Sequence, residues 1–294
     1  MDLFQRMIPQ QNVRAAEAIR EADMRDDSIA GLQHLYIEQN CFELAPDSSV
    51  HRVMEVKYLL EDVQSARLTH PRAGGETWGD PNENPLLKHS FTGNAGEDHG
   101  AVFSRIAKDI YAQCWTVDEH ESADAWAKFS RGNECVRVSS TPRKILSRLM
   151  NTISPFYGLS HFFGRILYTG QGSDQWLAGA EIKDLLDPLG QALMLSTHIL
   201  PDAYREEKEA RLIYFEHSPY IQNSDHVLAD TSLGILLRRI AFDWQDAIDE
   251  LILGPSVTSE TKTKIERLFA EKNVKCPIKH SAFRVPSLAK WRRN

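Results

Sequence analysis

Hydrophobic and polar positions along the chain follow two different periods, which predicts a mixture of helices and strands. Apolar residues recur at helical spacing through the first forty residues, so we expect a helix from 10 to 40. The polar cluster before Ser28 divides this helix, because serine is a favourable first residue for a second helix. We interpret residues 1–45 as an N-terminal helical appendage and 46–294 as a single second domain.

Beyond residue 46, short apolar runs bounded by turn residues dominate, and their length favours strands. The predicted strands lie at 50–54, 67–70, 112–116, 135–139, 164–168, 235–242, 247–253 and 277–283, and the predicted helices at 55–66, 121–129, 178–200 and 259–273. The order shows no regular alternation of strand and helix, so we expect an α+β fold with a mixed or antiparallel sheet and peripheral helices. Between the second and third strands, the polar and glycine-rich stretch 74–100 predicts a long loop, and loops of that length often carry function.

The most informative segment runs from Tyr204 to Tyr214. It contains Glu207 and Glu209, then Arg211, and ends in an apolar run that predicts a strand. With period-two alternation the two carboxylates and the guanidinium share one face. Such groups at the mouth of a buried strand are costly to desolvate, which favours a ligand site or a polar network. A solvated turn before an ordinary strand is the alternative.

Composition and targeting signals narrow the function classes. The 294 residues carry a net charge of −7, so any nucleic-acid contact needs a local basic patch, such as 137–148 or 290–293. The four cysteines are far apart and no His-Glu-x-x-His spacing occurs, so we expect no metal site. No secretory leader and no long apolar stretch are present, which predicts a cytoplasmic protein without a membrane contact.

Common catalytic motifs are missing from the sequence. Its glycines are too scattered for a dinucleotide fingerprint, and no Gly-x-Ser-x-Gly elbow occurs. The Glu-x-Glu segment therefore stays the main candidate for chemistry, and the question is which residues complement it.

Four further motifs occur in order along the chain. They are Val50-His51-Arg52-Val53-Met54 with the following helix; Gly79-Asp80-Pro81-Asn82-Glu83; Gln113-Cys114-Trp115-Thr116 with Ser122, Trp126, Phe129 and Cys135-Val136-Arg137-Val138; and Tyr204-x-x-Glu207-x-Glu209-x-Arg211 with Leu251-Ile252-Leu253-Gly254-Pro255. Taken together, over about 50–283, they resemble a bacterial family known as domain of unknown function 2971.

A looser resemblance is to the ADP-ribosyltransferases. Their order is Arg or His on an early strand, Ser, Thr or an aromatic residue on a middle strand, and Glu-x-Glu late. The resemblance implies an ADP-ribosyltransferase-like sheet, with NAD as substrate and no metal. It implies that Glu209 stabilises the oxocarbenium ion and that Glu207 activates the acceptor. The residues that it implies for NAD binding are Arg52 or His51, then Thr116, Trp115 and Ser139, with Arg211 setting the geometry of the glutamates.

Chemistry supports these residue types independently. Loss of nicotinamide builds positive charge on a ribose carbon, and a fixed carboxylate stabilises that charge. A second carboxylate can act as general base, and an arginine offers forked donors to ribose or diphosphate. We therefore expect residues 46–294 to be a catalytic domain that transfers ADP-ribose to nucleic acid, such as RNA or DNA, or to protein.

By family association, the setting is a bacterial toxin or anti-phage defence effector with a neutralising antitoxin protein. The alternatives are an NAD glycohydrolase, a nuclease whose metal is held by Glu207, Glu209 and Asp80, and a non-catalytic binding module.

Overall fold

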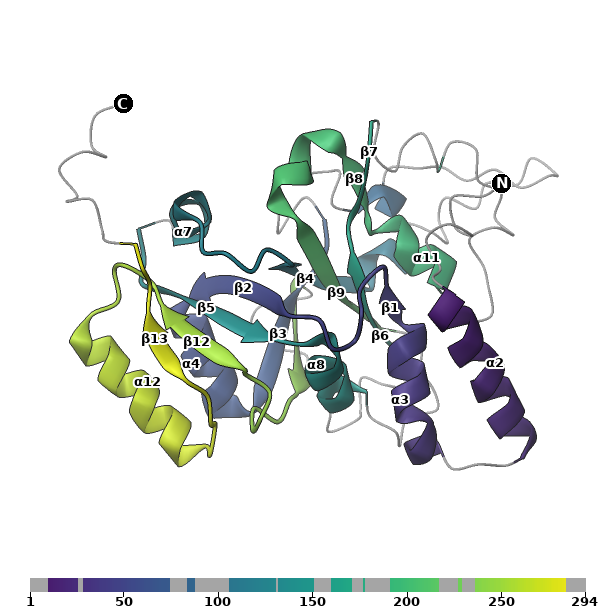
Figure 1. The fold of residues 1–294 in the computed structure, drawn as a ribbon, viewed down its shortest axis with the longest axis horizontal. Helices are drawn as coiled ribbons and strands as arrows, with labels where there is room; N and C mark the ends of the chain where they lie inside the picture. Colours follow the sequence, from purple (N-terminus) through teal and green to yellow (C-terminus); the bar gives the residue numbers. More distant parts are fainter. Residues whose placement is uncertain are drawn as a thin grey trace.

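The computed structural model describes residues 10–25, 29–74, 84–87, 106–130, 132–150, 160–170, 177, 191–216, 227–228 and 236–283 (Figure 1). Its strands are β1 (Cys41–Phe42), β2 (Val50–Glu55), β3 (Arg67–Pro71), β4 (Ile110–Thr116), β5 (Cys135–Ser140), β6 (His161–Arg165), β7 (Leu167–Thr169), β8 (Ile199–Pro201), β9 (Glu209–Phe215), β10 (Val227–Leu228), β11 (Leu237–Ala241), β12 (Glu250–Leu253) and β13 (Ile278–His280). Its α-helices are α2 (Gln10–Met24), α3 (Ile29–Gln39), α4 (Val56–Ser65), α7 (Ala123–Ser130), α8 (Pro142–Leu149), α11 (Gln191–Ser196) and α12 (Ser259–Glu271), and its 3-10 helices are η2 (Pro85–Leu87) and η4 (Asp202–Glu207).

One large mixed sheet organises the described part of the chain. Its 8 strands have the order β1-β6-β9-β4-β2-β5-β12-β13. The central strands are antiparallel, and the outer pairs β1–β6 and β12–β13 are parallel. Strands β10, β11 and β3 form a smaller antiparallel sheet. The prediction of an α+β fold with a mixed sheet is confirmed.

Helices cover both faces of the large sheet. Buried apolar residues of α3, α4, α8 and α12 pack in the main core against one face. On the other face, α11 packs on the β6–β9 side, and Trp126 of α7 packs against Val53, Cys135 and Ile252. Because α7 and α11 approach different halves of this face, the central strands between them can support a site.

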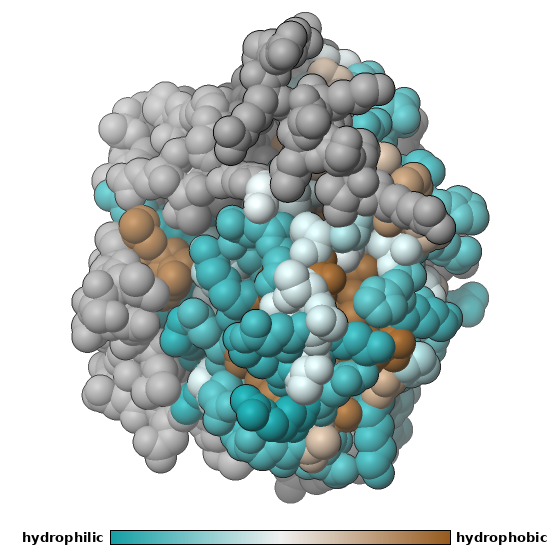
Figure 2. Space-filling model, turned by 90° about the vertical axis from the view of Figure 1, so that its left-hand side faces the viewer, coloured by the Kyte–Doolittle hydropathy of each residue, from teal (hydrophilic) through white to brown (hydrophobic). Residues whose placement is uncertain are grey.

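Local sequence signals explain where the helices begin. The hydroxyl of Thr141 accepts a hydrogen bond from the backbone of Lys144, and Pro142 occupies the first turn, where its missing N–H costs nothing. Thr258 caps α12 in the same way. Helix α12 buries one apolar face, and Figure 2, which views the molecule from the left of Figure 1, shows a surface with many hydrophilic residues.

Most elements lie close to the positions predicted from the sequence, but four points of the prediction were wrong. Helix α8 overlaps the predicted basic stretch 137–148, where the apolar positions of a short amphipathic helix were overlooked. The predicted helix 178–200 ends earlier, because β8 follows α11. The predicted strand 164–168 corresponds to the end of β6 and to β7. Glu207 belongs to η4 and not to the strand, so it does not share the strand face of Glu209.

The N-terminal segment joins the core through its later part. Ile37 of α3 and Cys41 of β1 are buried in the main core, and β1 pairs with β6. The boundary at residue 45 stays a prediction. Most of the predicted loop 74–100 lies outside the described residues. Within the part of the chain that the structure describes, no helix is long and apolar enough to cross a membrane.

Candidate active site

Strand pairing places four of the predicted site residues in one row across the sheet. Glu209 pairs with Thr116, Thr116 with His51, and His51 with Ser139. Directly paired residues point to the same face of a sheet. Neighbouring strands lie about 4.8 Å apart, so the row spans roughly 14 Å from β9 to β5. Residues from four separate parts of the sequence therefore form a single polar line.

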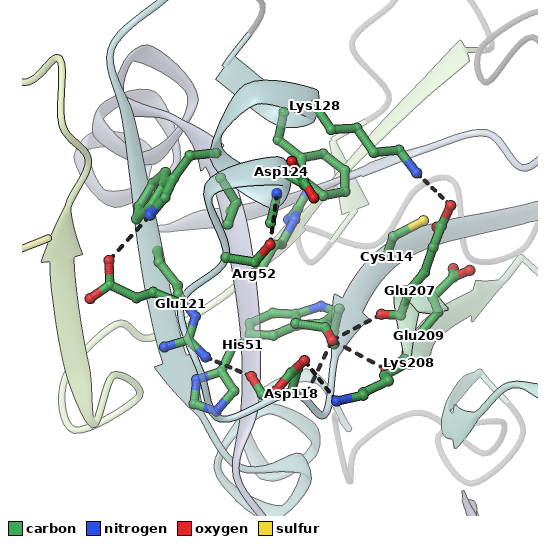
Figure 3. A pocket seen from close by; sticks show the side chains of 18 of the residues that line it. His51, Arg52, Cys114, Asp118, Glu121, Asp124, Lys128, Glu207, Lys208 and Glu209 are labelled. Atoms are coloured by element: carbon green, nitrogen blue, oxygen red, sulfur yellow. Dashed lines mark hydrogen bonds and ion pairs between the residues drawn. The ribbon is translucent and has the colours of Figure 1, made fainter. Parts of the chain in front are cut away.

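A cavity of about 520 Å³ lies beside this row. Its volume falls in the usual range for small-molecule sites, roughly 300–1,000 Å³. The turn at the start of β9 forms one wall, and α7 with the segment before it forms another (Figure 3). The lining residues include His51, Arg52, Cys114, Trp115, Thr116, Asp118, Glu121, Trp126, Lys128, Phe129, Arg137, Glu207, Lys208 and Glu209.

Glu209 is a buried carboxylate fixed by Arg211. Only 4% of Glu209 is exposed, and Nε of Arg211 donates to its Oε1 at 2.7 Å while Nη2 donates to Oε2 at 3.3 Å. Arg211 also donates to the Thr197 carbonyl at 2.8 Å. An ionised carboxylate accepts about four hydrogen bonds, so Glu209 keeps acceptor capacity for a ligand hydroxyl.

Glu207 is held quite differently, at the rim of the cavity. Its Oε1 accepts from Nζ of Lys128 on α7 at 2.5 Å, and both side chains are partly exposed. The turn itself is tied to β4, because the Thr116 hydroxyl donates to the Glu207 carbonyl at 3.0 Å. Lys208, which follows in the left-handed region with φ 45°, reaches Asp118 at 2.9 Å. The backbone is thus fixed, while the Glu207 carboxylate meets both Lys128 and solvent.

His51 and Arg137 form the buried polar part of the cavity. Nδ1 of His51 lies 2.8 Å from the Ser139 hydroxyl, and Nε2 is buried without a hydrogen-bond partner in the described structure. Burial, and next the charge of Arg137, lower the pKa of His51 to about 4, so the ring is neutral at pH 7. Arg137 is 4% exposed and donates to the Asp118 backbone carbonyl at 2.6 Å.

Arg52 and Trp115 border the cavity from other positions. Strand alternation directs Arg52 to the face of Val50 and Met54, which lie in the main core. Burial lowers the pKa of Arg52, and Asp62 of α4 is the first of the groups that oppose this shift. The Trp115 ring also packs in the main core, with its indole N–H donating to Gln113 at 3.1 Å.

The structure therefore gathers the predicted residues in two layers. His51, Arg52, Trp115, Thr116, Glu207 and Glu209 line the cavity, while Ser139 and Arg211 lie one layer behind, against His51 and Glu209. No role for Lys128 or Asp118 was predicted from the sequence, and Arg137 was noted only within a basic stretch and within the Cys135-Val136-Arg137-Val138 motif. Arg137 could have been noticed, because it alternates with Ser139 in an otherwise apolar strand.

Metal ligands do not cluster among the described residues. No group of three or more His, Cys, Asp or Glu side chains with suitable positions occurs within them. Asp80, which completed the metal set of the nuclease alternative, lies outside the described part of the chain.

Comparison with known proteins yields distant structural likeness only. No protein-family model and no curated protein sequence matches the chain, so the resemblance to domain of unknown function 2971 stays a prediction.

Solved structures of DarT from Thermus sp. 2.9 are similar to the chain. The complex with ADP-ribosylated single-stranded DNA has a TM-score of 0.35 at 9% identity, covering 81% of this chain and 96% of DarT. The complex with carba-NAD+ has a TM-score of 0.33 at 9% identity and covers 80% and 96%, and the complex with NAD+ has 0.32 at 10% identity and covers 80% and 97%. Likeness at this level defines neither activity nor ligand, and the chemistry rests on the residues of the cavity.

Proposed function

We propose that the chain is an NAD-consuming ADP-ribosyltransferase that modifies a macromolecule. The observation that carries this proposal is the row of Glu209, Thr116, His51 and Ser139 across four strands, with a cavity beside it. An acidic group at one end and neutral hydrogen-bonding groups along the row suit an elongated ligand whose reacting carbon lies beside Glu209.

In this proposal the reaction begins at the nicotinamide ribose. The bond between C1′ and the nicotinamide nitrogen breaks, and its electron pair leaves with nicotinamide. The carboxylate of Glu209 accepts a hydrogen bond from a ribose hydroxyl and faces the positive charge that develops on C1′. Arg211 fixes the carboxylate in one orientation but also offsets part of its charge. Glu209 therefore contributes mainly by orienting the ribose.

Glu207 serves the acceptor. A nucleophilic oxygen or nitrogen of the acceptor forms the new bond to C1′, and its proton passes to the Glu207 carboxylate. Its position at the rim supports this role, because a macromolecular acceptor reaches the cavity from outside. Lys128 engages Oε1, which leaves Oε2 to receive the proton.

NAD binding is assigned to the polar row and its flanks. Thr116 and His51 lie between Glu209 and β5, and Arg52 borders the same cavity. Ser139 orients His51 through Nδ1, and Arg211 orients Glu209. Trp115 is assigned the weaker role of supporting the cavity wall from the core.

The acceptor and the biological setting complete the proposal. A nucleic acid, RNA or DNA, or a protein is the acceptor, and the setting is a bacterial toxin or defence effector in the cytoplasm with a neutralising antitoxin. Growth arrest on expression, relieved by Glu209→Gln or by the adjacent gene product, is the expected result. Harmless high-level expression of the wild type contradicts this setting.

The decisive experiment incubates the protein with labelled NAD and separate pools of RNA, DNA and protein, with and without a chelator. Label transfer to one pool that is insensitive to chelator supports the proposal. Release of free ADP-ribose without transfer indicates a glycohydrolase. Nucleic-acid cleavage that stops with chelator indicates a nuclease, and no turnover of any kind indicates a binding module.

A further inference from the structure

Arg137 differs from most charged residues of this cavity in how it is held. Several of the others form direct ion pairs: Glu207 with Lys128, Asp118 with Lys208, and Glu209 with Arg211. Arg137 donates to one backbone carbonyl, that of Asp118, and no ion pair involves it within the described structure. Keeping a buried charge without a counter-charge is costly, and such charges usually serve a partner that binds them.

His51 provides a second, independent indication of a ligand site at the same place. Its Nε2 is buried and has no hydrogen-bond partner among the described residues, although His51 borders the cavity. Only 7% of His51 is exposed. The neutral ring can accept from the Ser139 hydroxyl at Nδ1, and it then carries its proton on Nε2, ready to donate.

Strand registry brings the two groups together. Val53 of β2 pairs with Arg137 of β5, and His51 pairs with Ser139, so Arg137 and His51 project from the same face of adjacent strands. The Arg137 side chain reaches Asp118, beyond the end of β4, and therefore passes across β2 toward the Glu209 side of the cavity. Figure 3 shows His51 and Asp118 side by side in this part of the cavity.

We propose that Arg137 and Nε2 of His51 form an anion subsite that binds the diphosphate of a dinucleotide. Both groups are donors, and a guanidinium matches the two oxygens of a phosphate in a forked geometry. His51 is two strands from Glu209, about 10 Å, so a diphosphate here leaves one ribose near Glu209. The inference deepens the proposed function and rests on it for the identity of the dinucleotide.

The carboxylates near the subsite are each held by other groups. Asp118 is engaged by Lys208, and this hydrogen bond lowers the pKa of Asp118. Glu121 accepts from the Trp126 indole at 3.2 Å and from the Ser281 hydroxyl at 2.5 Å, and Glu250 pairs with Lys279. The charges of Glu121, Asp118 and Glu250 oppose the lowering of the Arg137 pKa by burial, but none of these carboxylates forms an ion pair with the guanidinium within the described structure.

The test measures binding by calorimetry, with inorganic pyrophosphate, ADP-ribose, nicotinamide riboside and a single-stranded oligonucleotide as separate probes. Arg137→Gln is expected to weaken pyrophosphate and ADP-ribose binding at least tenfold and to leave nicotinamide riboside, which lacks phosphate, nearly unchanged. Arg143→Gln, beside Asp47 and not among the residues that line the cavity, is the matched control and should bind pyrophosphate, ADP-ribose and nicotinamide riboside like the wild type. His51→Asn, which loses Nε2, should show a smaller loss than Arg137→Gln.

Arg137→Lys is the control for misfolding, because lysine keeps the buried positive charge but lacks the forked donors of a guanidinium. It should fold and show an intermediate loss. Equal pyrophosphate affinity in wild type, Arg137→Gln and Arg137→Lys overturns the subsite, as does a wild type that binds no pyrophosphate. If pyrophosphate binds through Arg137 but NAD is neither bound nor consumed, the subsite stands and the proposed function fails. If only the oligonucleotide depends on Arg137, the anion belongs to nucleic acid and the dinucleotide assignment is wrong.

Discussion

Glu207 and Glu209 are separated by one residue, yet their side chains differ in burial and in how they are held. Glu209 is buried and gripped by Arg211 through two hydrogen bonds, in a strand at the centre of the sheet. Glu207 ends a 3-10 helix, and its contact with Lys128 is open to solvent. Identical side chains therefore have different energetics, and this difference is the basis for the separate roles that we propose: a fixed orientation for Glu209 and exchange with an incoming acceptor for Glu207.

The largest expected effect is that of Glu209→Gln. The substitution removes the carboxylate charge that pairs with the buried Arg211 guanidinium, and breaking such a pair costs roughly 3–5 kcal/mol. We expect a loss of that size in the free energy of unfolding, measured by urea denaturation. NAD turnover should fall by about 10²–10³, measured at a temperature where the variant stays folded. A variant with wild-type turnover contradicts the catalytic assignment.

The double variant Glu209→Gln, Arg211→Met separates stability from catalysis. Removing both charges deletes the guanidinium together with its Glu209 partner, and a buried ion pair replaced by uncharged groups is often tolerated. Part of the stability lost in Glu209→Gln should therefore return, while NAD turnover stays as low as in the single variant. Recovered turnover in the double variant would show that Glu209 acts only through folding.

Acid should destabilise the folded protein, because three buried histidines have lowered pKa values. Burial lowers the pKa of His51 to about 4, of His70 to about 3 and of His198 to about 4, from an ordinary value of 6.5. The unfolded chain therefore binds more protons between about pH 4 and 6.5, so the stabilising contribution is complete above pH 6.5 and is lost as pH falls toward 4.

His51→Asn should reduce this pH dependence. One group contributes at most about 1.4 kcal/mol per pH unit, and the variant removes that share. Urea denaturation at pH 5 and pH 7 measures the difference. An unchanged slope in the variant would mean that His51 titrates normally in the folded protein.

The smallest effect on stability is expected for Glu207→Gln. Exposed ion pairs contribute about 0–1 kcal/mol, and added salt screens them, so the variant should unfold like the wild type at high salt. Its transfer activity should fall more than its NAD hydrolysis, because only transfer needs an activated acceptor. Equal loss of both activities would place Glu207 in NAD binding. Lys128→Met, which removes the partner, is the matched control for the ion pair itself.

Periodicity and residue types by themselves determined the class of the fold and the position of the main candidate. The strand lengths at 50–54 and 135–139, and the apolar run after Glu209, depend on side-chain spacing that is local to each segment. The Glu-x-Glu pair was noticeable for the same reason, since charged residues at the start of a buried strand stand out in a one-dimensional pattern.

Only the tertiary structure decided how these segments meet. Strand order and register placed Thr116, His51 and Ser139 in line with Glu209, and no local signal encodes pairing between residues that are far apart in the chain. The exposed position of Glu207 follows from a 3-10 turn, which alternation along an ideal strand does not predict. The environment of Arg137 is likewise decided by the tertiary structure, because its burial and the lack of a direct ion pair among the described residues arise only when the sheet is assembled.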